Sequence, residues 1–247
     1  MTARRLALAL PLLAVGLAVA APVPKLEAEP GPATKQQLRT ARQRMADILI
    51  ALHNYHDAVG HFPANVTDGK GVTTLSWRVQ LLPYLEQNAL YEKFDLKEAW
   101  DGPNNRKLIA DMPDCFAPAR GKTKNAGDTF YQGFEGNGTM FQTGRKTRIA
   151  DISDGTSNTI AVVEAGEPVT WTKPGDIPFD AKAAELPKLG GVFDVEFFVG
   201  MCDGSVRLAL TKHIDPAQFL MRVTANGGEV ADWDAADAAF GWERKRR

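Results

Sequence analysis

The sequence is poor in cysteine: only Cys115 and Cys202 occur among its 247 residues. They do not form a Cys-x-x-Cys pair, which excludes the usual dithiol redox motif. In an oxidising compartment, an even number of cysteines permits one disulfide, here between Cys115 and Cys202. The alternative is that both are unpaired, small apolar residues.

Motifs that identify common enzymes are also missing. The sequence has no Gly-x-Ser-x-Gly nucleophile elbow and no His-Glu-x-x-His zinc-hydrolase motif. Gly133, Gly136 and Gly138 follow neither a clear strand nor a helix start, so they do not predict a phosphate-binding loop. An excess of positive charge is lacking too, because the formal net charge is -1. We therefore expect a non-catalytic protein that has no cofactor and does not bind nucleic acid.

The first 20 residues predict an export signal. Arg4 and Arg5 precede an apolar run over residues 6–19, which ends in small residues that suit cleavage between Ala20 and Ala21. The run is shorter than the roughly 20 residues of a comfortable bilayer span. We therefore expect no stable membrane span after cleavage, and an uncleaved anchor is the alternative. The chain should work outside the cytoplasm, in the periplasm, on the cell surface or secreted.

A long amphipathic helix is expected after a proline-rich linker over residues 21–33. Thr34 and Gln37 fit a capping box at its start, and Gly60 can end it in the left-handed conformation. Apolar residues recur between them at spacings of three and four, which is typical of a helix with one buried face. They are Leu38, Ala41, Met45, Ile48, Leu52, Tyr55 and Val59. Ala46, Leu49 and Ile50 broaden this face, which favours packing on a sheet or on other helices of the same domain.

Short helices and then strands are expected in the rest of the chain. Residues 76–94 predict helical structure with a kink or a break at Pro83, and residues 104–112 predict a short helix. Residues 158–165 predict a strand. Asp215 is placed to cap a short helix that runs to residue 223.

The clearest β-hairpin lies in residues 195–210. A two-residue turn at Asp203-Gly204 would place Met201 opposite Val206. The alternating apolar residues of both strands would then share one buried face, with Cys202 on the other. Together these elements predict an α+β fold over residues 34–231, in which the long helix packs on a mainly antiparallel sheet with short inserted helices. Residues 232–247, with a basic end, predict a solvated tail.

A series of short motifs resembles one known family. The motifs are Ala51–Asp57, Gly60–Pro63, Ser76–Val79, Leu81–Gln87, Trp100–Asp101, Pro103–Asn105, Asp151–Thr159, Trp171–Pro174 and Asp203–Val206. They are similar to those of planctomycete-type exported proteins, a domain of unknown function that resembles pseudopilins and was formerly grouped with solute-binding proteins. The resemblance implies a pilin-like α+β fold and a place in the cell envelope, but no activity.

The chain departs from the pattern of this family in two ways. Many relatives begin with a prepilin signal that continues into the helix, whereas here a proline-rich linker intervenes. Relatives often carry a histidine ten residues before the Asp of the Asp-Gly turn, and the matching residue here is Phe193. The resemblance therefore implies neither assembly through a shared hydrophobic stalk nor a role for that histidine.

Three histidines are candidate ligands for a transition metal. His53 and His56 are three residues apart and share a helix face, and His61 follows closely. No carboxylate completes a known metal motif around them. The alternative is that they flank the buried face of the helix and form local hydrogen bonds.

Oxygen ligands for calcium gather in a second motif. Asp151, Asp154, Ser157 and Asn158 lie close together around Gly155. Their order does not match the EF-hand loop, and the same residue types satisfy the backbone of a tight turn before a strand. Both interpretations remain open from the sequence.

The sequence thus predicts a non-catalytic structural or interaction module of the cell envelope. Its partners would be envelope proteins or a saccharide. The alternative is an extracytoplasmic module that binds a small ligand, a saccharide or calcium. The third hypothesis is a metal-dependent enzyme that uses the histidines.

Overall fold

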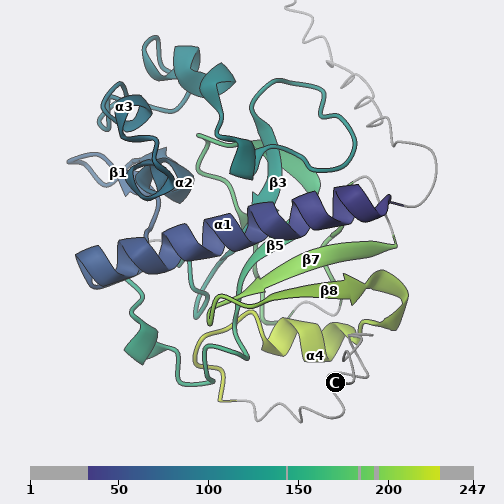
Figure 1. Cartoon of the computed structure of the whole chain (residues 1–247). Coiled ribbons are helices and arrows are strands. Elements are labelled where there is room, and N and C mark those ends of the chain that lie inside the picture. Colours follow the sequence, from purple (N-terminus) through teal and green to yellow (C-terminus); the bar gives the residue numbers. More distant parts are fainter. Residues whose placement is uncertain (1–32, 143, 183–184, 192–194, 229–247) are drawn as a thin grey trace, which may run out of the picture.

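A computed structural model describes residues 33–142, 144–182, 185–191 and 195–228. The predicted signal peptide, almost all of the linker and the C-terminal tail lie outside these residues. The described chain has an α+β fold, as predicted, with one long helix across a four-stranded sheet (Figure 1).

The long helix, α1, spans Lys35–Val59. Both residues of the predicted capping box bond as expected: the Thr34 side chain accepts from the backbone N–H of Gln37, and the Gln37 side chain accepts from that of Thr34. Gly60 ends the helix with φ 86°, a left-handed conformation that glycine adopts without a Cβ penalty. The predicted apolar face is buried from Ala41 to Tyr55.

Two residues of the predicted apolar face are exceptions. Ile50 is 57% exposed and Val59 is 45% exposed, so the prediction that Ile50 broadens the buried face was wrong. Leu49, by contrast, is buried as expected. Ile50 directly follows Leu49, and a step of about 100° around the helix carries it from the sheet to solvent.

The main sheet has the strand order β3-β5-β7-β8, and every pair in it is antiparallel. Its strands are β3 Asp128–Gln132, β5 Ile160–Thr170, β7 Glu196–Met201 and β8 Val206–Leu210. The strand predicted at residues 158–165 is therefore present and longer than expected. The short helix α4, Pro216–Met221, follows β8 and is capped by Asp215 as predicted.

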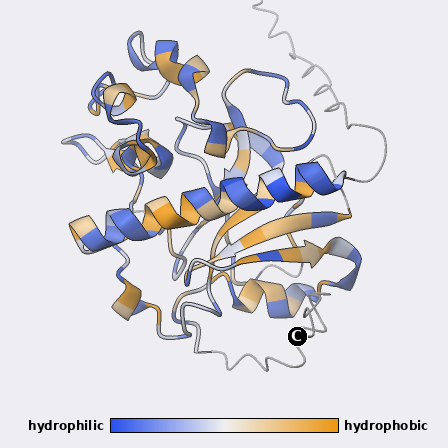
Figure 2. Cartoon of the chain, in the orientation of Figure 1, coloured by the Kyte–Doolittle hydropathy of each residue, from blue (hydrophilic) through white to orange (hydrophobic). Residues whose placement is uncertain are grey.

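Both faces of this sheet are covered. One apolar cluster joins α1 to the face that carries Phe198 and Val162, and a second joins Phe219 of α4 to the face that carries Phe197 and Val199. Apolar and polar residues accordingly alternate around α1, whereas β7 is largely apolar (Figure 2). The fold is thus helix, sheet and short helix in three layers.

The predicted register of the hairpin was wrong by one residue. Val206 lies opposite Gly200 rather than Met201, and the Met201 N–H donates to the Ser205 carbonyl. The loop therefore has three residues and ends in Gly204 at φ 84°, the usual place for a left-handed glycine in such loops. A one-residue shift turns every side chain of β8 to the opposite face. Leu208 consequently packs on the side of α1, and not with Phe197 as predicted.

Short helices and two small sheets complete the domain. The short helices are α2 Trp77–Gln80, α3 Asn88–Tyr91 and the 3₁₀ turns η1 Leu82–Leu85, η2 Asn105–Asp111, η3 Asp114–Phe116, η4 Ile149–Asp151 and η5 Thr211–His213. The small sheets pair β1 Val66–Thr67 with β2 Thr73–Leu75, and β4 Phe134–Glu135 with β6 Ile177–Pro178. Pro83 lies at the start of η1, so the predicted break in the helix of residues 76–94 occurs there.

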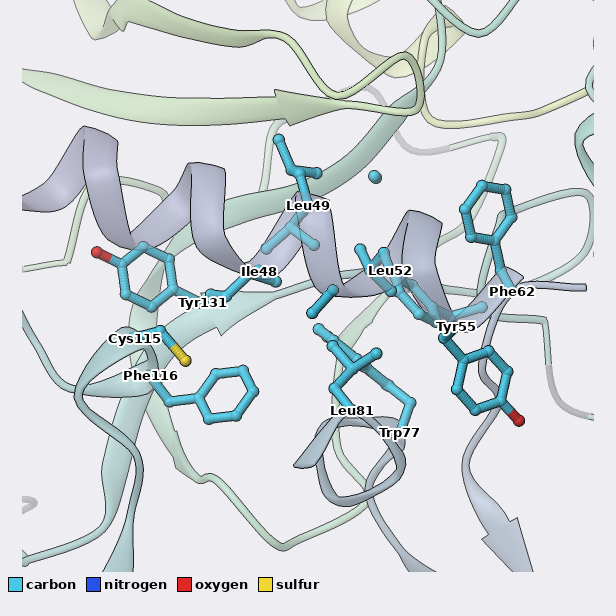
Figure 3. Packing of buried hydrophobic residues seen from close by; sticks show 14 of the residues in the cluster. Ile48, Leu49, Leu52, Tyr55, Phe62, Trp77, Leu81, Cys115, Phe116 and Tyr131 are labelled. Atoms are coloured by element: carbon cyan, nitrogen blue, oxygen red, sulfur yellow. The ribbon is translucent and has the colours of Figure 1, made fainter. Parts of the chain in front are cut away.

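Residues of α2 and η3 pack along α1 beside the sheet (Figure 3), and η1 contacts α1 as well. Trp77 and Leu81 approach Ile48 and Leu52 of α1, and Phe116 of η3 lies beside Tyr131 of β3. Each such large apolar side chain contributes about 1.5–3 kcal/mol when it is fully buried. The family motifs around residues 76–87 therefore build the core that holds α1 in place.

Candidate functional site

The three histidines predicted as metal ligands pack against aromatic rings, His53 and His56 against Phe62 and His61 against Tyr55. The rings of His53 and His56 lie 5.7 and 4.9 Å from that of Phe62, and the ring of His61 lies 6.0 Å from that of Tyr55. These are edge-on and tilted packing contacts. The histidines thus cap the apolar face at the C-terminal end of α1.

Local hydrogen bonds use nitrogens of two of these rings. Nε2 of His56 accepts from the backbone N–H of Ile149 at 3.2 Å, and Nδ1 of His61 donates to the carbonyl of Phe62 at 2.8 Å. In the part of the chain that the structure describes, no three His, Cys, Asp or Glu side chains form a group that could hold a metal ion. The structure therefore does not assemble the predicted transition-metal site.

Asp151 of the predicted calcium cluster is an acceptor for Arg148. Its Oδ1 lies 2.7 Å from Nη2 of Arg148, and its Oδ2 accepts from the backbone N–H of the same residue at 2.9 Å. These hydrogen bonds hold the pKa of Asp151 well below its usual range. The carboxylate closes the turn η4.

Asp154 fixes the last residues that the structure describes. Its two carboxylate oxygens accept from the backbone N–H groups of Gly227 and Gly228 at 2.7 and 3.1 Å. Asn158 donates from its side chain to the backbone carbonyl of Asp154 at 2.8 Å. The carbonyl of Ser157 accepts from Arg207 of β8 at 3.1 Å.

These contacts give the Asp151–Asn158 motif a structural role. The N–H donors engage the carboxylate oxygens of Asp151 and Asp154, and the motif joins η4, β8 and residues 227–228. Oδ1 of Asn158 is the exception, because it is buried and has no hydrogen-bond partner among the described residues. The turn interpretation of the motif therefore accounts for most of its polar groups.

The disulfide considered for Cys115 and Cys202 is not formed, since both are free, buried thiols. Cys115 lies in η3 beside the N-terminal half of α1, whereas Cys202 lies at the β7–β8 turn with its sulfur 3.6 Å from that of Met140. Burial raises the pKa of Cys115 to about 12, and it also raises the pKa of Cys202. Thiols of this kind are poor nucleophiles at neutral pH.

Two buried ion pairs were not predicted from the sequence. Arg78 of α2 pairs with Asp176, and Arg120 pairs with Glu164 of β5 at 2.9 Å. Burial raises the pKa of Glu164, and Arg120 beside it opposes that shift. The sequence did hold a signal for these buried pairs, namely a charged residue inside an apolar run, as in Trp77-Arg78-Val79 and in residues 160–165.

A small cavity adjoins the second of these pairs. It has a volume of about 10 Å³ and is lined by Arg120, Glu164 and Tyr131, among others. This is room for about one water molecule. The cavity is too small for a substrate or a cofactor.

A larger hollow runs along the exposed edge of α1. This open groove, which we call the α1 groove, has a volume of about 420 Å³ and lies between α1, η1 and η3. Its apolar lining includes Ile50, Tyr84 and Leu85. Its acidic residues are Asp47, Glu86 and Asp114, and no Lys or Arg of the described residues lines it.

The chain is an α+β domain, and the polar motifs singled out from its sequence mostly form hydrogen bonds within the fold. A family model matches residues 40–190, and the chain belongs to this family, a protein family of unknown function (DUF1559), also labelled SBP_bac_10. No curated protein and no solved structure matches the chain. Over the described residues, no helix has both the length and the apolar character needed to cross a bilayer.

Proposed function

We propose that this chain is a non-catalytic interaction module of the cell envelope that works outside the cytoplasm. The proposal rests on one observation: polar residues that the sequence suggests as metal ligands form hydrogen bonds within the fold. Asp151 and Asp154 accept N–H groups, and His56 and His61 bond to backbone atoms. Chemistry on a substrate needs polar groups that converge on an enclosed pocket, and the α1 groove, although acidic at its rim, is open to solvent.

The extracytoplasmic location is supported by the first 20 residues, which have the charge, apolar run and small residues of an export signal. A pseudopilin-like role in planctomycete-type bacteria is supported by the long N-terminal helix packed across an antiparallel sheet. In this role the domain presents surfaces to other envelope proteins, while α1 stays packed on its own sheet.

A second candidate function is the binding of calcium or of a small ligand. Calcium is favoured by one observation, the buried and unpartnered Oδ1 of Asn158 within the Asp151–Asn158 motif. A small ligand or a saccharide would use the α1 groove, where Tyr84 is half-buried. A metal-dependent enzyme that uses His53, His56 and His61 is the weakest of the three functions.

Cross-linking in intact cells tests the proposed interaction. A short amine- or carboxyl-reactive cross-linker should convert a large share of the chain into species heavier than the monomer, because a module that acts by contact spends much of its time bound. The matched control is the same treatment after the envelope proteins have been dissociated with denaturant. Recovery of the chain as a monomer under both conditions would contradict the proposal.

A further inference from the structure

The charge and shape of the α1 groove are complementary to one class of partner. Its rim carries the carboxylates of Asp47, Glu86 and Asp114, and Glu86 and Asp114 are exposed to solvent. Within the part of the chain that the structure describes, no basic residue lines the groove, and the nearby guanidinium of Arg44 is held by the carbonyl of Ala117 at 3.0 Å. The groove therefore repels anionic lipid headgroups, nucleic acid and acidic segments.

The floor of the groove adds an apolar requirement. Ile50 is one of the few large hydrophobic side chains that are more than half exposed, and Leu85 and Tyr84 lie across from it. Such residues favour contact with an apolar or aromatic side chain. Neither a free metal ion nor a simple polyamine carries such a group. A segment that fits must therefore carry positive charge and bulky apolar groups together.

We infer that the α1 groove is a docking site for an extended polypeptide segment of another envelope protein, one that presents Lys or Arg next to an aromatic or aliphatic residue. The cationic groups lie against Asp47, Glu86 and Asp114, and the apolar group covers Ile50. This inference rests on the proposed interaction function and names the chemistry of the partner. The contact is electrostatic at its rim, so its affinity falls as salt screens the carboxylates.

A synthetic peptide with the sequence of residues 240–247 is a suitable probe, because it contains two aromatic residues and four cationic ones. Binding is measured by fluorescence anisotropy to the full chain and to the protein without residues 240–247, at low and at high salt. We expect saturable binding that weakens at least about tenfold between roughly 50 mM and 500 mM salt. A peptide in which the four cationic residues are replaced by glutamine should bind at least about tenfold more weakly.

Variants of the groove can lower its negative charge and leave the fold intact. Glu86 has φ 59°, which a glycine adopts more easily, so Glu86→Gly removes a carboxylate without strain. The double variant Asp47→Asn/Glu86→Gly should lower peptide affinity about tenfold and leave the melting temperature unchanged or higher. Asp57→Asn, which removes an exposed carboxylate of α1 outside the groove, is the control and should bind as the parent does.

Three results would overturn the inference. They are equal binding of both peptides, equal binding by the groove variant and the control, and binding to the full chain that is much weaker than to the truncated one. The last result would make residues 240–247 of this chain the occupant in place of another protein. Failure of the peptide together with persistent cross-linked complexes in cells would remove this docking site and leave the interaction module itself standing.

Discussion

Arg78 and Asp176 form an ion pair in which both side chains are fully buried and Nη2 lies 2.8 Å from Oδ1. The same carboxylate accepts from the Trp77 indole and from the backbone N–H of Gly133, both at 2.9 Å. Arg78 also donates twice to the carbonyl of Tyr131, at the edge of the sheet. The pair therefore joins α2, β3 and the segment before β6.

Removal of one partner of this pair should be strongly destabilising. Asp176→Asn leaves the Arg78 guanidinium buried without a counter-charge, so we expect the free energy of unfolding to fall by about 3–5 kcal/mol. Chemical denaturation with urea measures the change. Glu167→Gln, which breaks the exposed pair with Lys188, is the control and should cost less than about 1 kcal/mol. Similar costs for the two variants would show that Arg78 and Asp176 are not paired in the folded chain.

The contact between α1 and the sheet is tested at Gly200 of β7. A Cβ at this position would lie 3.0 Å from the side chains of Leu49 and Met45. Gly200→Val adds a larger side chain at this contact, so α1 must shift to make room for it. We expect the free energy of unfolding to fall by about 1–3 kcal/mol. Gly69→Val is the control, because no atom of the described residues lies within 4 Å of its added Cβ, and it should change stability by less than about 0.5 kcal/mol. An unchanged stability for Gly200→Val would contradict the register of β7 under α1.

The Asp151–Asn158 motif is tested by a substitution and a metal titration. Asp154→Ala removes two exposed hydrogen bonds to the N–H groups of Gly227 and Gly228, which water can replace in part, so we expect the free energy of unfolding to fall by about 0.5–1.5 kcal/mol. Because no three acidic, His or Cys side chains of the described residues gather into a group that could hold a metal ion, calcium and chelator should give the same melting temperature for the parent. A calcium-dependent rise that Asp154→Ala abolishes would favour the calcium-binding alternative, since a ligand bound only by the folded state must stabilise it.

The thiols of Cys115 and Cys202 should resist alkylation in the folded protein. Both are buried, and the pKa of each is raised by burial, so little thiolate forms near pH 8. Iodoacetamide followed by mass spectrometry should label neither cysteine without denaturant and both with it. Prompt labelling of Cys115, which borders the α1 groove, would show that η3 opens in solution. A species two hydrogens lighter than the dithiol would show a disulfide.

Local patterns in the sequence were sufficient for the elements whose cause is local. The caps at Thr34 and Gly60, the break at Pro83 and the cap at Asp215 each depend on neighbouring residues, and the structure confirms them. The buried face of α1 was also predictable, because it follows from the spacing of apolar residues.

Features that depend on distant parts of the chain were not predictable in the same way. The turn at Asp203-Gly204 fits loops of two or three residues, and only the pairing of β7 with β8 decides between them. Ile50 is apolar, but its exposure follows from the positions of η1 and η3 around α1. The partner of Arg78 lies 98 residues away, and the α1 groove is formed by three separate segments. No periodicity reports such contacts.

The central claim, a module that is exported and works outside the cytoplasm, is tested most directly by the intact mass of the chain recovered from fractionated cells. The account predicts that the chain is found in the envelope or the extracellular fraction, with a mass that lacks residues 1–20. Recovery of the chain from the cytosol with Met1 and the apolar run still present would contradict it.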